Sequence, residues 1–195
     1  IIESCEQSLR DLHTDHLDVL LLHRPDYLMP VDEVASAFNR LKEAGKVKHF
    51  GVSNFSVAQF ELLQAAVDVP LVTNQIEFSP YQLSALESGV FEQSQIQQFS
   101  VMAWSCLGGG DLLKGQTQRS QRLLLALTDV MNAVGADSID QVVYAWVLAH
   151  PATILPLLGS CNIERYRSAI KALHITIEHE QWYSIWQAAV GHSVA

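Results

Sequence analysis

The sequence is poor in cysteine, and its three cysteines are not spaced for a metal site. Cys5, Cys106 and Cys161 lack the Cys-x-x-Cys spacing of zinc sites, and their odd number does not suit a disulfide framework. No stretch approaches the roughly 20 consecutive apolar residues that a membrane-spanning helix needs. A signal-peptide pattern is also missing. These absences predict no metal site, no membrane association, and reduced thiols in a cytoplasmic location.

Positive charge is also scarce. The 12 lysines and arginines are outnumbered by 21 aspartates and glutamates, so the net charge is −9. This balance argues against non-specific binding to nucleic acid or to an anionic membrane. It still leaves room for a local basic pocket that binds a small phosphate.

The length and the hydrophobic content predict one globular domain over residues 1–195. Hydrophobic residues make up 49% of the 195 and charged residues 17%, which is ordinary for a folded protein with a buried core. A complete two-layer barrel would normally need a longer chain. No internal repeat or linker indicates a second domain.

Short apolar runs alternate with amphipathic segments along the chain. We expect strands at 16–22, 48–54, 71–75, 100–105 and 153–158. We expect helices at 2–12, 30–44, 56–66, 85–99, 123–134, 139–148, 163–173 and 180–190, and a glycine-rich loop at 108–113. Because the strands are apolar without alternation, they predict a parallel α/β sheet whose two faces are covered by helices. A (β/α) barrel and an open doubly wound sheet both fit, although the GxGxxG fingerprint of the open sheet is missing.

Polar residues occur at the carboxyl end of each expected strand. They are His23, Ser53-Asn54, Asn74-Gln75, Trp104-Ser105 and Gly159-Ser160. In a parallel barrel these ends converge on one face, where active sites lie. Each position alone has an ordinary structural explanation, such as a hydrogen-bonded core histidine, an Asx turn or aromatic packing. Five such positions together favour a binding site.

The segments that carry these residues resemble the aldo/keto reductase family. HLDVLLLHRPD, GKVKHFGVSNFS, TNQIEFSPY, MAWSCLGGG and LPLLGSCNIERYRSAI match the family in order and spacing, over essentially the whole chain. GVSNF with NQIEFSPY is the most specific pair. The closing segments are most similar to bacterial reductases of unassigned substrate.

The resemblance implies a TIM-type (β/α)8 barrel that binds NADP(H) and reduces a small-molecule aldehyde or ketone. This chain would supply about the last five strand–helix units and a C-terminal helix. By this resemblance His23 matches the active-site histidine, which orients the carbonyl. Ser53, Asn54 and Gln75 match residues that hold the nicotinamide carboxamide, and Trp104 matches the aromatic residue on which the nicotinamide ring stacks.

The remaining matches concern the phosphates of the cofactor. Ser105 and Leu107 match positions along the pyrophosphate, and Ser160 and Arg165 match the clamp of the adenosine 2′-phosphate. A guanidinium binds a phosphate through two parallel donors, which favours NADP over NAD. Arg165 would lie in the first turn of the helix after Asn162, where the helix dipole assists anion binding.

The sequence departs from the family pattern at two cofactor positions. Gly159 replaces the lysine of many members, which predicts a weaker grip on the 2′-phosphate, and Ala169 replaces a polar adenine contact. The catalytic tyrosine, and the lysine and aspartate that tune it, have no match here. None of the five tyrosines of this sequence occupies the position of the catalytic tyrosine. They are Tyr27, Tyr81, Tyr144, Tyr166 and Tyr183.

Because the chain opens at Ile1 inside an expected helix, we expect a truncated chain. Five strands would leave two unpaired edges, so we expect a missing N-terminal segment or a second copy of the chain to complete the barrel. The leading hypothesis is an NADP(H)-dependent carbonyl reductase whose isolated chain is inactive. The alternatives are a catalytically inactive nucleotide-binding subunit and a truncated fragment without function. Residues 106–121 are expected to form a mobile flap.

Overall fold

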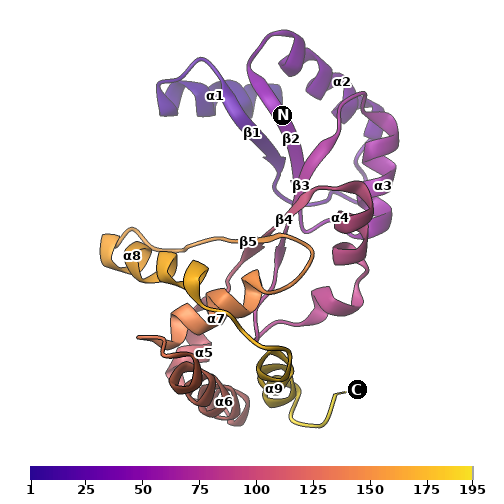
Figure 1. Ribbon diagram of the computed structural model, residues 1–195. Coiled ribbons are helices and arrows are strands. Elements are labelled where there is room, and N and C mark those ends of the chain that lie inside the picture. The colour runs from indigo at the N-terminus through magenta and orange to yellow at the C-terminus, as the bar shows by residue number, and fades with distance from the viewer. Residues whose placement is uncertain (195) are drawn as a thin grey trace. The chain divides into compact units, whose positions relative to one another are not determined.

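The computed structural model describes residues 1–194 and has an α/β fold with a parallel sheet (Figure 1). The strands lie in the order β1-β2-β3-β4-β5. They are β1 (Leu17–Leu22), β2 (Val47–Ser53), β3 (Leu71–Glu77), β4 (Ser100–Trp104) and β5 (Ile154–Pro156). All five expected strands are present, and the α/β class predicted from the apolar runs is confirmed.

Helices separate the strands along the chain. They are α1 (Ile2–Leu12), α2 (Val31–Glu43), α3 (Val57–Ala66), α4 (Val90–Gln97), α5 (Asp111–Lys114), α6 (Gln118–Val134), α7 (Ile139–Leu148), α8 (Ile163–Lys171) and α9 (His179–Val190). Three short 3₁₀ turns are η1 (Ser84–Glu87), η2 (Gly108–Gly110) and η3 (Ala172–His174). The cap predicted for α3 is confirmed, since the Ser56 hydroxyl accepts from the backbone N–H of Gln59 in a capping box.

The structure corrects three boundaries. The single helix expected at 85–99 is divided into η1 and α4, because Gly89 adopts a left-handed φ of 79° between them. The loop expected at 108–113 contains η2 and α5. Helix α6 begins at Gln118 rather than at residue 123, because Thr117 and Ser120 form a capping box at its start.

The chain divides into two compact units, each of which is described by itself. Unit 1 comprises residues 1–76 and 88–101, and unit 2 comprises residues 77–87 and 102 onward. The single domain expected over 1–195 stays a prediction, and Ala195 lies outside the described residues. Within the described residues, none of the helices has the length and apolar composition needed to cross a bilayer.

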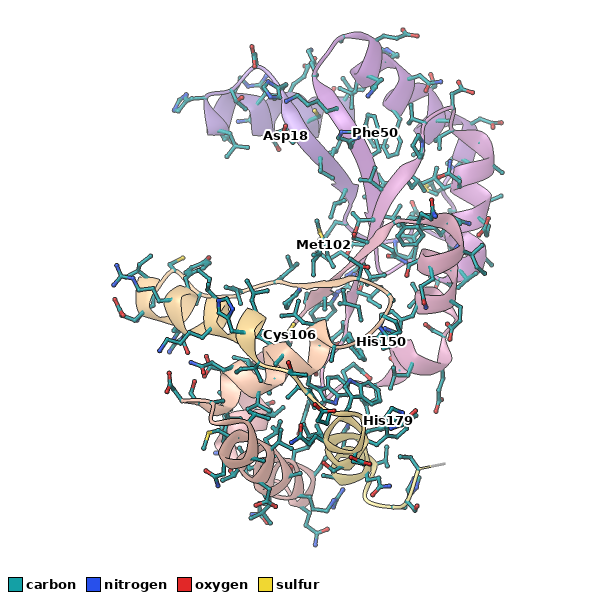
Figure 2. All side chains as sticks on the ribbon, viewed as in Figure 1. Asp18, Phe50, Met102, Cys106, His150 and His179 are labelled. Atoms are coloured by element: carbon teal, nitrogen blue, oxygen red, sulfur yellow. The ribbon has the colours of Figure 1, made fainter. Side chains whose placement is uncertain are left out.

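The core of unit 1 lies between its strands and helices α2 and α3. Phe50 of β2, labelled in Figure 2, stacks on Phe38 of α2 with ring centroids 4.1 Å apart, and both side chains are fully buried. Strand β1 is different, because none of its residues is buried and Val19 is 39% exposed. The expectation of a strand buried on both faces is therefore wrong for β1, which is the outermost strand in the sheet order and pairs with β2 alone.

The core of unit 2 is aromatic. Trp146 of α7 is fully buried, and its ring lies 5.2 Å from that of Phe78. Helices α6 and α9 lie side by side (Figure 1), where the guanidinium Nε of Arg122 donates to the carbonyl of Ala188 at 3.1 Å. The contact of Trp146 with Phe78 anchors α7, which forms part of the pocket described below.

Candidate functional site

The parallel register brings the strand ends of unit 1 to one edge. Leu22 of β1 pairs with Val52 of β2, and Ser53 pairs with Gln75 of β3. His23 directly follows Leu22, so its backbone leaves β1 at the level where Ser53 ends β2. Three of the predicted positions therefore share the carboxyl edge of unit 1, where His23 is exposed.

Hydrogen bonds fix the turn that follows β2. The Ser53 hydroxyl, 2% exposed, donates to the carbonyl of Gln75 at 3.0 Å, and the Asn54 side-chain amide donates to the Ser53 hydroxyl at 2.8 Å. Asn54 has a left-handed φ of 60°, which asparagine tolerates better than most residues. Buried Asn74 donates to the carbonyl of Phe55 at 2.8 Å and closes the turn. The Ser53 hydroxyl thus orients the side-chain amide of Asn54 by accepting its hydrogen bond.

Unit 2 contains a pocket of about 850 Å³. Its lining includes all five residues of this unit that the resemblance assigns to the cofactor: Trp104, Ser105, Leu107, Ser160 and Arg165. They come from the end of β4, the loop after it, the segment between β5 and α8, and the first turn of α8. One cavity thus brings together residues as far apart in the sequence as Trp104 and Arg165.

The glycine-rich turn lets the backbone form one wall of this pocket. Gly109 and Gly110 line the pocket with φ values of 63° and 91°, where other residues are strained. At neighbouring Gly108 an added Cβ would lie 3.0 Å from the Cβ of Tyr81. The turn therefore packs against Tyr81 on one side and presents bare backbone to the pocket.

The start of α8 is organised by its N-cap. The Asn162 side-chain oxygen accepts from the backbone N–H of Glu164 at 2.8 Å, and the Ser160 hydroxyl accepts from the N–H of Asn162 at 3.2 Å. Arg165 lies in the first turn of α8, as the sequence predicted, and the structure shows that it is exposed. An added Cβ at Gly159 would meet nothing within 4 Å, so this end of the pocket is open to solvent and to a ligand.

Helix α7 contributes residues that sequence reasoning missed. Ser138, Asp140 and Tyr144 line the pocket. Burial, followed by the charges of Cys106 and Asp140, raises the pKa of Tyr144 to about 12. Burial likewise raises the pKa of the Cys106 thiol to about 12, so neither group ionises near neutral pH. The sequence carried little signal for this wall, because serine and aspartate at the start of a helix ordinarily act as caps.

Comparison with known proteins identifies the family. The model of the aldo/keto reductase family matches residues 1–189. The chain belongs to the aldo/keto reductase family. The expected resemblance is confirmed, and the parallel α/β sheet matches the solved structures of this family.

Individual relatives are bacterial oxidoreductases. The chain is 50% identical to the oxidoreductase YdhF of Escherichia coli, over 100% of this chain and 64% of that protein. It is 43% identical to a 6-dehydroglucose reductase of Agrobacterium fabrum, over 98% of this chain and 63% of that protein. A solved aldo/keto reductase from Klebsiella pneumoniae, in complex with NADP and acetate, aligns with a TM-score of 0.78 and 31% identity, over 94% of this chain and 62% of that one. The chain thus spans less than two thirds of the length of these relatives.

Proposed function

We propose that this chain is the cofactor-binding part of an NADP(H)-dependent oxidoreductase that reduces an aldehyde or ketone to an alcohol. The observation that carries the proposal is the unit 2 pocket, which gathers the five residues assigned to the cofactor by family resemblance. The Klebsiella pneumoniae relative, solved with NADP, supports the choice of cofactor. The proposed location is cytoplasmic, in keeping with three free cysteines.

The pocket has the donor groups that NADP(H) needs. The Arg165 guanidinium and the Ser160 hydroxyl suit the 2′-phosphate, because both donate to phosphate oxygens. Trp104, half-buried at the end of β4, offers an aromatic face to the nicotinamide ring, and Ser105 and Leu107 line the path assigned to the pyrophosphate. When bound, NADP(H) supplies the hydride that is transferred to the carbonyl carbon.

The edge residues of unit 1 carry the remaining roles in the proposal. A nicotinamide carboxamide has one acceptor and two donors, which the amides of Asn54 and Gln75 can pair with. Ser53 then acts through Asn54, whose amide it holds. His23, exposed at the end of β1, orients the carbonyl of the substrate through an imidazole nitrogen.

We also propose that the complete barrel includes polypeptide beyond these residues. The outer strands expose apolar side chains, with Val19 of β1 39% exposed and Leu155 of β5 43% exposed. A further segment or a second copy of the chain would cover them, and a further segment would supply the catalytic tyrosine for which the resemblance finds no match in this chain. Native mass spectrometry tests this point: a particle heavier than the 21.7 kDa chain supports it, and a well-folded monomer contradicts it.

Oxidation of NADPH in the presence of small aldehydes and ketones tests the activity. The chain is assayed alone and after co-expression with the part of the Escherichia coli relative that it does not match. We expect activity only in the second case, and expect His23→Ala to reduce kcat at least tenfold. Asp129→Asn, an exposed change on α6 outside the pocket, serves as the control. Failure of the folded, assembled protein to oxidise NADPH with any carbonyl contradicts the proposal.

A further inference from the structure

Helices α7 and α8 are joined at the pocket by a directed chain of hydrogen bonds. The backbone N–H of Asp137 donates to Oε1 of Gln141 at 3.1 Å, which turns the Gln141 amide nitrogen toward Ser168. That nitrogen donates to the Ser168 hydroxyl at 3.0 Å. The hydroxyl in turn donates to Oδ2 of Asp140 at 3.3 Å. Gln141 is 2% exposed and its amide is oriented by the Asp137 N–H, so the Ser168 hydroxyl accepts from Gln141 and keeps its own proton for Asp140 or for the Ser138 hydroxyl, which also lies 3.3 Å away.

Asp140 reaches the pocket as a carboxylate without a cationic partner. It is half-buried and lines the pocket, and within residues 1–194 no lysine, arginine or histidine forms an ion pair with it. The other carboxylate of the pocket, Glu164, is paired with Arg167 at 2.7 Å. A partly buried carboxylate is stable when it accepts hydrogen bonds. A ligand that fits this wall should therefore bring an N–H or O–H donor to Asp140.

The position of this wall relative to Arg165 indicates which part of the ligand it meets. Ser168 lies three residues after Arg165 on α8, so the two side chains are neighbours on adjacent turns of one helix face. If Arg165 holds the 2′-phosphate, as the proposed function requires, Asp140 and Ser168 lie beside the adenosine. Ala169, which replaces a polar adenine contact of the family, is only 8% exposed and has no polar side-chain atom.

We propose that Asp140, oriented by Ser168, accepts a hydrogen bond from the 6-amino group of adenine and makes the pocket selective for 6-aminopurine nucleotides. This inference rests on the proposed function, because it takes the ligand to be NADP(H). Adenine offers two N–H donors at that position, whereas a 6-oxopurine offers a carbonyl oxygen. Two acceptors facing each other form no hydrogen bond and repel.

The test compares NADPH with its hypoxanthine analogue, in which a carbonyl replaces the 6-amino group. Isothermal titration calorimetry with the full chain measures both dissociation constants. We expect the analogue to bind about 10- to 100-fold more weakly, as follows from losing a hydrogen bond to a charged group. Asp140→Asn should reduce that ratio to about twofold, because a primary amide can present either its oxygen or its nitrogen.

Two further variants separate selectivity from general effects. Ser168→Ala removes the group that orients Asp140 and should lower the ratio to an intermediate value while both nucleotides still bind. Asp129→Asn makes the same change of charge on α6, away from the pocket, and should leave the ratio unchanged. Circular dichroism verifies that each variant is folded. If Asp140→Asn does not fold, the inference is tested by the ratio of the two dissociation constants in the wild type and in Ser168→Ala.

The outcomes are distinguishable. Equal binding of NADPH and its hypoxanthine analogue by the wild-type chain overturns the inference and leaves the proposed function intact. The inference is also overturned if Asp140→Asn keeps the analogue ratio but changes the ratio of NADPH to NADH affinity, because Asp140 would then face the ribose. If the folded chain binds no NADPH at all, the proposed function is contradicted, and this inference with it.

Discussion

Trp146 of α7 and Trp182 of α9 exchange hydrogen bonds. The indole N–H of Trp146 donates to the carbonyl of Trp182 at 3.0 Å, and the indole N–H of Trp182 donates to the carbonyl of Trp146 at 3.1 Å. Their rings stack with centroids 4.7 Å apart and an interplanar angle of 7°. Because α7 carries Asp140 and Tyr144, this reciprocal pair fixes the helix that forms one wall of the pocket.

Replacement of Trp182 by phenylalanine tests the pair. The change leaves the carbonyl of Trp146 without its indole donor, and we expect the free energy of unfolding to fall by about 1–3 kcal/mol. Urea denaturation followed by circular dichroism measures the loss. Trp186→Phe is the matched control, since Trp186 contacts Trp182 only edge to face, at 5.7 Å. If both variants lose the same free energy of unfolding, the reciprocal hydrogen bonds do not stabilise the protein beyond the packing of the rings.

A lysine at Gly159 should strengthen NADPH binding. The backbone there has no left-handed φ, and an added Cβ meets nothing within 4 Å, so the side chain has room. A solvent-exposed ammonium near the 2′-phosphate should improve the free energy of NADPH binding by about 1 kcal/mol, which is roughly a fivefold gain in affinity. Gly159→Lys should leave NADH affinity unchanged, and its gain should shrink as salt is raised. Gly159→Gln controls for side-chain bulk, and an equal gain for NADH would contradict the expectation.

The ion pair between Asp137 and Lys171 should make stability depend on pH. The Lys171 ammonium donates to Asp137 Oδ2 at 2.7 Å, which lowers the pKa of Asp137 below its ordinary value of 3.8 and raises the pKa of Lys171 above its ordinary 10.5. The stabilisation by Asp137 is therefore present above pH 3.8 and is lost as the pH falls through the lowered pKa. The contribution of Lys171 is present below pH 10.5 and is lost as the pH rises through the raised pKa.

The contribution of this ion pair to stability is measured by comparing the urea unfolding of Asp137→Asn with that of the wild type. We expect the variant to unfold at a lower urea concentration than the wild type near neutral pH, with a difference that vanishes at strongly acidic pH. The effect is small and sensitive to salt, because both side chains are more than 60% exposed. Asp129→Asn serves as the control, because it removes the same negative charge from an exposed site on α6. A difference between wild type and Asp137→Asn that persists at strongly acidic pH would contradict the assignment.

Local sequence signals predicted the strands well and the helix boundaries less well. The apolar runs predicted all five strands, and Ser56 predicted the start of α3. The break at Gly89 was missed because the amphipathic pattern of 85–99 is weak on both sides of it. The first turn of α6 was missed because QRSQR has no apolar spacing, although Thr117 and Ser120 could have indicated the cap. Burial of β1 was overestimated, since an apolar run does not reveal how many neighbouring strands cover it.

Positions at strand ends were more informative than helix starts for the candidate site. The reasoning that carboxyl ends of parallel strands converge led to Trp104 and Ser160, which line the same pocket. It could not lead to Asp140 or Ser168, because these lie on helices and meet only when α7 packs against α8. Their importance depends on tertiary contacts that no local pattern encodes.

Binding of 2′,5′-ADP to the full chain tests the central claim most directly, because this ligand contains only the adenosine and phosphate part of NADP. Calorimetric titration compares 2′,5′-ADP with 5′-AMP, for the wild type and for Arg165→Gln. The account predicts saturable binding to one site, a preference of at least about tenfold for 2′,5′-ADP, and loss of that preference in Arg165→Gln. No saturable binding by the folded wild-type chain, or a preference that survives Arg165→Gln, would contradict it.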